Sequence, residues 1–254
     1  MSMSRHACAI VACLVFLGPA SAGDNRSASV DPSAKPSESA ALCSGERQTS
    51  PENWIKACTE IVRTGTTPSE RAVAHYNRAR AYRAGGQNER AIADYTQAIG
   101  LMADFSVAYQ NRGVAYNAIG NLDRAIADYS QAIKLQPDLA VAYNNRGVAL
   151  KNKRQFALAL ADFTKAIELD PQSPWAYNNR ADAYFLSGDW SKAIADYSLA
   201  LALNPELSYS LFARGAAKTH RGDSFSGRAD MKAAAVLNPK VAEEQAKDGI
   251  IPLT

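Results

Sequence analysis

The 254-residue sequence is 47% apolar and carries a formal charge of +3, the composition of an ordinary globular chain of one or two domains. So small a positive charge argues against nucleic-acid binding, which requires a clustered basic surface. Two histidines, His75 and His220, follow the N-terminal segment; they are far apart and lack metal-ligand spacing. No nucleophile or phosphate-binding motif appears. The sequence therefore predicts no enzymatic activity, cofactor or metal site.

Residues 1–22 have the three-part pattern of a secretory signal. Arg5 precedes an apolar run over residues 7–17, and Pro19–Ala22 ends in an A-x-A pattern, which predicts cleavage after Ala22. The run is too short to span a bilayer, which takes roughly 20 residues. An alternative is lipidation at Cys13, because residues 10–13 resemble a lipoprotein processing box. We expect export to the periplasm or the cell exterior, with no membrane span.

Residues 23–42 are rich in serine, alanine and proline, and are predicted to form a flexible linker. Residues 43–71 follow as an N-terminal cap, in which residues 54–62 have the apolar spacing of a helix. Cys43 and Cys58 are an even pair in a chain bound for an oxidising compartment, so we expect them to form a disulfide.

From residue 72 the sequence repeats with a 34-residue period. The units are 72–105, 106–139, 140–173, 174–207 and 208–241. Positions 8, 20 and 27 of each unit are alanine or glycine, position 24 is large, and four units have proline at position 32. Each unit contains two helical stretches around a turn such as Gly120-Asn121. The small residues allow the two helices to approach closely, and neighbouring pairs must stack to bury their apolar faces.

This pattern resembles the tetratricopeptide repeat, and the whole is similar to an exported bacterial member of that family. The resemblance implies an all-α, right-handed solenoid of about five helix pairs, with residues 43–71 supplying an N-terminal half-repeat. It also implies that the first helix of each pair lines a concave groove. Residues 242–254 are left as a C-terminal tail.

Two charged positions recur in all five units. Position 7 is arginine: Arg78, Arg112, Arg146, Arg180 and Arg214. Position 23 is aspartate: Asp94, Asp128, Asp162, Asp196 and Asp230. The common tetratricopeptide pattern has an aliphatic residue at position 7 and often an aromatic residue at 23. We interpret the pairs as ion pairs between the two helices of each unit, because the guanidinium fork suits a carboxylate. The alternative is a role in ligand binding.

Position 6 is asparagine in the first four units: Asn77, Asn111, Asn145 and Asn179. Helical spacing places it on the face opposite the packing positions. The run resembles the asparagine ladder of the O-linked N-acetylglucosamine transferase superhelix, where such residues hold peptide backbone amides. One carboxamide offers both a donor and an acceptor. The alternative is that these asparagines hydrogen-bond neighbouring helices and serve only the scaffold.

Other side chains on the same face would set which partner binds. The apolar members are Val107, Val141, Trp175, Phe185, Tyr209 and Phe212. The basic members are Arg80, Arg83 and Lys151, which could meet a carboxylate or an acidic stretch. Some of the apolar residues could instead pack against the next repeat. Aromatic anchors are frequent binding hot spots.

The sequence thus predicts a non-enzymatic interaction module of the cell envelope that binds an extended peptide or partner segment in its groove. The alternative is a membrane-tethered structural or assembly component of an envelope complex. A protein or peptide partner is expected in either case, and the oligomeric state is not predicted.

Overall fold

The computed structural model describes residues 38–44 and 50–252, which form thirteen helices and no strand. The predicted signal peptide and residues 23–37 of the predicted linker lie outside the described residues. None of the described helices is both long and apolar enough to cross a membrane. The all-α repeat fold predicted from the sequence is confirmed.

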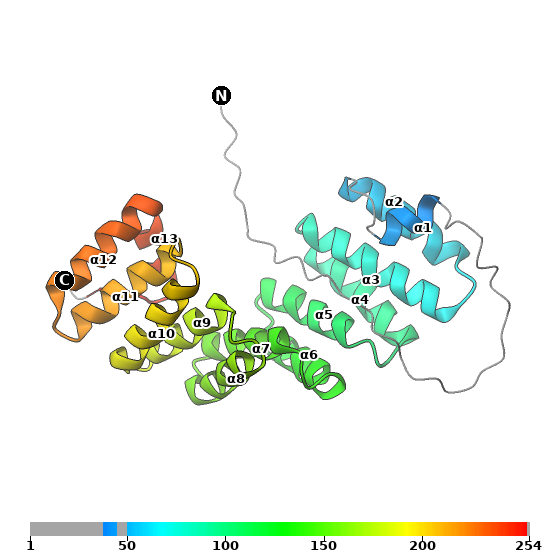
Figure 1. Ribbon diagram of the computed structural model, residues 1–254. Coiled ribbons are helices and arrows are strands. Elements are labelled where there is room, and N and C mark those ends of the chain that lie inside the picture. Colours follow the sequence, from blue (N-terminus) through cyan, green and yellow to red (C-terminus); the bar gives the residue numbers. More distant parts are fainter. Residues whose placement is uncertain (1–37, 45–49, 253–254) are drawn as a thin grey trace, which may run out of the picture. The chain divides into compact units, whose positions relative to one another are not determined.

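The helices alternate between two positions in a stack (Figure 1). The first helices are α3 (Pro68–Ala84), α5 (Ser106–Ala118), α7 (Ala140–Asn152), α9 (Pro174–Leu186) and α11 (Ser208–His220). The second helices are α4 (Asn88–Leu101), α6 (Leu122–Leu135), α8 (Phe156–Leu169), α10 (Trp190–Leu203) and α12 (Ser224–Leu237). The remaining helices are α1 (Glu38–Ser44), α2 (Pro51–Thr64) and α13 (Val241–Lys247).

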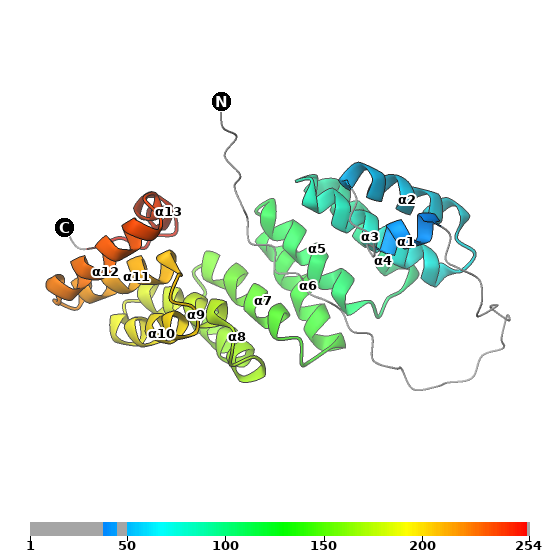
Figure 2. The same cartoon turned by 45° about the horizontal axis from the view of Figure 1, so that its top comes forward.

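Each helix packs on its neighbours in the chain, and the first helices have an additional set of contacts (Figure 2). Contacts join α3 to α5, α5 to α7, α7 to α9 and α9 to α11, whereas no second helix contacts the next second helix within residues 50–252. The first helices therefore line the inner side of the stack. We call the side of these helices that is turned away from their second helices the inner face.

Small residues set the spacing within each helix pair. In the third pair, Phe163 is fully buried, and a Cβ atom added to Gly147 would lie 2.6 Å from its ring. In the second pair, Tyr129 lies against Gly113 in the same way, at 2.7 Å. Interiors are close-packed, so any larger residue at these glycines would displace the aromatic ring.

The turn between the two helices of a pair requires a left-handed backbone. Gly86, Gly120, Gly188 and Gly222 occupy this position with φ of 73°, 77°, 86° and 95°. In the third pair the residue is Arg154, with φ of 59°. This conformation brings Cβ close to the following carbonyl oxygen and costs a non-glycine residue about 1–2 kcal/mol.

We therefore expect Arg154→Gly to raise the free energy of unfolding by about 1 kcal/mol, because glycine removes this strain. Arg124→Gly is the control: it places glycine in the first turn of α6, where no left-handed residue is needed, and should not stabilise. Urea denaturation of the two variants measures the difference. An Arg154→Gly variant no more stable than the wild type would contradict the strain argument.

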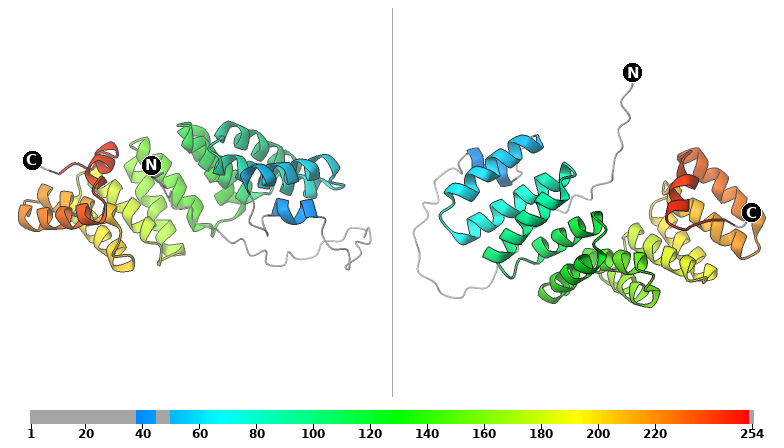
Figure 3. Two further views of the ribbon diagram at one scale, coloured as in Figure 1. Left: turned by 90° about the horizontal axis from the view of Figure 1, so that it is seen from above. Right: turned by 180° about the vertical axis from the view of Figure 1, so that it is seen from behind.

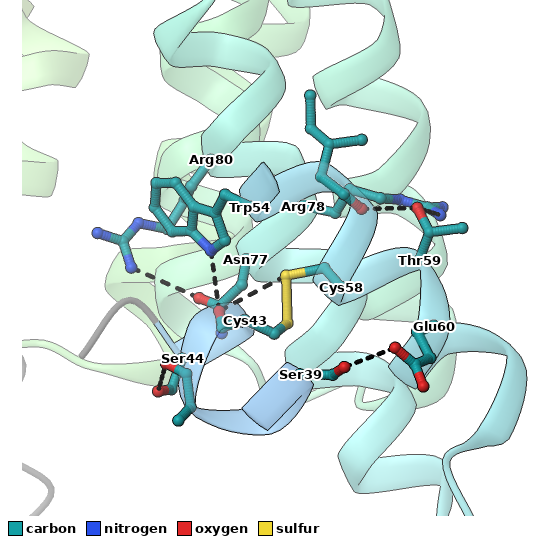
Figure 4. Close-up of a disulfide and its surroundings, with 12 residues drawn as sticks. Ser39, Cys43, Ser44, Trp54, Cys58, Thr59, Glu60, Asn77, Arg78 and Arg80 are labelled. Carbon is teal, nitrogen blue, oxygen red and sulfur yellow. Dashed lines mark hydrogen bonds between the residues drawn. A yellow bond between two sulfur atoms is a disulfide. The ribbon is translucent and has the colours of Figure 1, made fainter. Parts of the chain in front are cut away.

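The N-terminal end of the stack is closed by α1 and α2 (Figure 4). Cys43 of α1 and Cys58 of α2 are placed as a disulfide with Cα atoms 4.7 Å apart. The indole Nε1 of Trp54 donates a hydrogen bond to the Cys43 carbonyl oxygen at 2.9 Å. The helix α1 begins at Glu38, so ordered structure starts within the segment predicted as linker. The reason is Leu42, which packs against the buried cysteines.

Replacing Cys58 with serine should lower stability by about 3 kcal/mol, the loop-closure value for a 15-residue separation. Because each repeat contacts only its neighbours, the loss should be largest at α1–α3. Thermal melts with and without a reductant, combined with thiol counting by mass spectrometry, test this. A free-thiol count of two in the oxidised wild-type protein, made without its first 22 residues, would overturn the pairing.

Candidate functional site

The recurring arginines and aspartates meet in every repeat. Two guanidinium nitrogens of each arginine bond both oxygens of the aspartate 16 residues later, with distances from 2.6 to 3.0 Å. The arginine side chains are 16–23% exposed and the carboxylates 7–13%. With its charge matched inside its own repeat and little of it exposed, each arginine has few donors left for a ligand.

Each arginine also reaches a third helix, a contact that the sequence analysis missed. Its remaining nitrogen, Nη1, donates to a hydroxyl of the preceding second helix: Thr59, Thr96, Ser130, Thr164 and Ser198 in turn, at 3.0–3.3 Å. One guanidinium therefore joins three helices from two successive units. The signal was present, because threonine or serine recurs at position 25 of the first four units.

The pKa values reflect this bonding. Hydrogen bonding to Asp128 raises the pKa of Arg112, against the effect of burial. Burial by itself would raise the pKa of Asp94, but hydrogen bonds from Arg78 and His75 outweigh it and lower that pKa. His75 Nδ1 lies 2.9 Å from Asp94 Oδ1, so this histidine belongs to the scaffold.

The asparagines at position 6 differ from one another in accessibility and bonding. Asn77 is 5% exposed and lies beside α1, so it is covered at the N-terminal end. Asn111 donates to Tyr76 Oη at 3.0 Å, and Asn179 donates to Asn144 Oδ1 at 3.0 Å, each across a repeat boundary. Asn145 is half-buried, and its side chain has no hydrogen bond within the described residues. Two of the four amides thus bond neighbouring first helices, as the scaffold alternative expects, while Asn145 remains available.

The basic residues of the inner face are also partly engaged. Arg80 lies over the Trp54 ring, with 5.2 Å from its guanidinium carbon to the ring centroid. Lys151 Nζ forms a 2.8 Å ion pair with Asp182, a carboxylate of the next first helix. Arg83 keeps a buried Nε without a hydrogen-bond partner in the described part of the chain. Of the three predicted carboxylate binders, Lys151 is therefore already matched by the chain itself.

The aromatic residues predicted as anchors fall into two groups. Trp175 is 43% exposed. Phe185 and Phe212 are each 6% exposed: Phe185 packs in a cluster with alanines of α11 and with Ile250, and Phe212 in a cluster with Ala234 of α12 and Val241 of α13, as the packing alternative expects. Tyr209 lies close to Glu244 of α13. Its pKa is raised to about 12, mainly because burial disfavours the phenolate and secondly because the Glu244 charge does so too.

On α3 the apolar residue of the inner face, Val73, is 42% exposed but its amide, Asn77, is buried, so the apolar row and the amide row are accessible together only in the middle, on α5, α7 and α9. Val107, Val141 and Trp175 follow one another at 34-residue steps, and Asn111, Asn145 and Asn179 lie one helical turn farther along the same helices. Within the described residues no group of three or more histidine, cysteine, aspartate or glutamate side chains is arranged to hold a metal ion. What this middle stretch offers is a row of apolar side chains beside a row of amides.

Family models match most of the repeat region. A model described as tetratricopeptide repeat matches residues 140–173 and 174–207, a second with the same description matches 72–104, and one described as TPR repeat matches 113–153. The chain is a tetratricopeptide repeat protein. No curated protein sequence matches this one closely enough to count as a relative.

Solved structures share the fold of this tetratricopeptide protein at low sequence identity. MamA residues 41 to the end, from Desulfovibrio magneticus RS-1, is 20% identical, with 66% of this chain and 96% of that one covered, at a TM-score of 0.62. YrrB, titled a TPR protein with an unusual peptide-binding site, is 18% identical, with 76% and 99% covered, at 0.60. PilW, titled a widely conserved type IV pilus biogenesis factor, is 19% identical, with 78% and 90% covered, at 0.67. At these identities the likeness is one of fold.

The buried ion pairs make a stability prediction. Asp162→Asn should cost about 3 kcal/mol, because it leaves the Arg146 guanidinium without a counter-charge in a mostly buried position. Asp123→Asn is the control, since Asp123 pairs with Lys153 but is 81% exposed, and such pairs contribute less than about 1 kcal/mol. Chemical denaturation measures both, and equal losses would refute a scaffold role for the Arg146–Asp162 pair.

Proposed function

We propose that this protein is an exported interaction module that binds an extended segment of a partner protein on the inner face of α5, α7 and α9. The tetratricopeptide fold is a protein-interaction scaffold, and its members are generally not enzymes.

The observation that carries the proposal is the environment of Asn145 and Trp175. Asn145 is half-buried, its carboxamide has no hydrogen-bond partner in the part of the chain that the structure describes, and Trp175 exposes 43% of its surface on the neighbouring first helix. A carboxamide can donate to one group of a peptide unit and accept from another. An exposed tryptophan supplies a large apolar contact of the kind that dominates binding energies. Together they suit a peptide whose backbone bonds the amides while one of its side chains covers the indole.

Export is supported by two features of the N-terminal part. The first 22 residues have the pattern of a secretory signal. The structure also has a disulfide between Cys43 and Cys58, and such bonds are typical of proteins in oxidising compartments. We therefore place the partner in the periplasm or outside the cell. YrrB, described by its title as having an unusual peptide-binding site, shares the fold and makes a peptide ligand reasonable here.

A random peptide library selected on the wild-type protein supplies ligands with which to test the proposal. Asn145→Ala combined with Trp175→Ala should weaken the selected peptides at least tenfold, because it removes an amide contact and an aromatic anchor. The control is Gln97→Ala combined with Leu158→Ala, which makes similar changes at exposed positions of α4 and α8.

Fluorescence anisotropy with labelled peptides measures both affinities, once melting curves show that the two variants fold like the wild type. The control variant should bind as the wild type does. If the inner-face variant also keeps full affinity for every selected peptide, the proposed site is wrong.

A further inference from the structure

The chain turns back on itself after α13 and inserts one residue into the inner face of the last two repeats. Gly249, with φ of 79°, and the bond from Ile250 N to Gln245 O at 3.0 Å end the helix and reverse the chain. Ile250 is 1% exposed and lies in the cluster with Phe185, Tyr197 and Ala216. Ile251, the next residue, is 54% exposed. Figure 3 shows α13, in red, beside α11 and α12.

The backbone of this segment is held as well as its side chain. His220 Nε2 donates to the Ile251 carbonyl oxygen at 2.6 Å. The imidazole is fixed by Trp190, stacked with a centroid distance of 5.0 Å, and by the edge of Phe185 at 5.3 Å. An apolar socket for one aliphatic side chain, beside a fixed donor to a backbone carbonyl, is the arrangement by which a groove binds an extended peptide.

The covering segment contains groups that oppose its own docking. Gln245 of α13 is 3% exposed, and its Oε1 has no hydrogen-bond partner within the described residues. A buried acceptor without a partner has lost its bonds to water and gained none in return, which disfavours the docked state. Partial burial raises the pKa of Asp248; the Lys151 charge opposes this rise, and the Asp182 charge adds to it. The carboxylate of Asp248 is therefore less well solvated when docked than when free.

The helix that carries the segment is also weak. At seven residues, α13 is far shorter than the roughly 12–15 residues that an isolated helix needs for marginal stability. The helix therefore depends on the contacts of Val241 with the repeats, and the segment after it depends mainly on Ile250 and the bond from His220. Both contacts can be exchanged for equivalent ones from another chain.

We propose that residues 248–251 form a displaceable internal ligand, and that the site beneath them binds an extended partner segment carrying a branched aliphatic side chain. The partner's aliphatic residue takes the place of Ile250, and its backbone carbonyl takes the bond from His220. This site lies at α9 and α11, whereas the peptide site proposed above lies on α5, α7 and α9. Each proposal can therefore fail its own test without the other failing.

The test uses a fluorescein-labelled peptide of residues 245–252 and full chains lacking only the first 22 residues. Ile250→Asp places a charge in the apolar socket and should release the internal segment. The matched control is Ile251→Asp, the same change at the exposed neighbour. We expect the Ile250→Asp chain to bind the peptide at least tenfold more tightly than the control and wild-type chains. A peptide with aspartate in place of Ile250 should bind none of them.

Equal peptide affinity of the Ile250→Asp and Ile251→Asp chains overturns the proposal. Hydrogen exchange on the wild-type chain is a second measurement that does not depend on a variant folding. The amides of residues 241–251 should exchange at least tenfold faster than those of α11, because the segment opens without the repeats unfolding. Exchange as slow as that of α11 would make the segment a permanent part of the fold and would also overturn the proposal.

Discussion

The guanidinium that joins three helices is the interaction on which the stack depends. In each repeat one arginine bonds the aspartate of its own second helix and a hydroxyl of the preceding second helix. Small residues and aromatic rings bring helices into contact but allow them to slide and rotate, whereas a planar fork with a bidentate partner fixes their relative position. Since desolvation offsets much of the Coulomb energy of such a pair, its main contribution is to specify the packing.

The same arginine explains how the inner face acquires its polar row. With position 7 committed to the contacts between helices, position 6 is turned about 100° around the helix. The asparagines therefore lie at the edge of the inner face, close enough to the preceding first helix for Asn111 and Asn179 to bond it. The amides of Asn111 and Asn179 serve the scaffold there, whereas the Asn77 amide lies beside Arg80 of its own helix, and the Asn145 amide has no hydrogen-bond partner among the described residues.

Features that recur with the period could be predicted from the sequence, and those that occur once could not. The alternation of helices, the glycines under Tyr129 and Phe163 and the matched charges each appear several times at fixed spacing. The threonine or serine at position 25 also recurs, but a small uncharged hydroxyl does not indicate by its charge or size which residue it contacts. The insertion of Ile250 has no period at all, because it is a single tertiary contact between a chain end and α9 and α11. The local sequence around Gly249 indicates a turn, but nothing in it identifies the surface against which Ile250 packs.

A finite stack must end, and here both ends cover the inner face as well as the exposed edges of the terminal helices. At the N-terminal end α1, held by Cys43, lies beside Val73 and Asn77 over a cavity of about 310 Å³. At the C-terminal end Ile250 fills the position against Phe185. Capping units are needed because a terminal repeat would otherwise expose its apolar side. Because Asn77 is buried at one end and Phe185 at the other, the apolar and amide rows lie open together only on α5, α7 and α9, and a partner at the C-terminal site would have to displace Ile250.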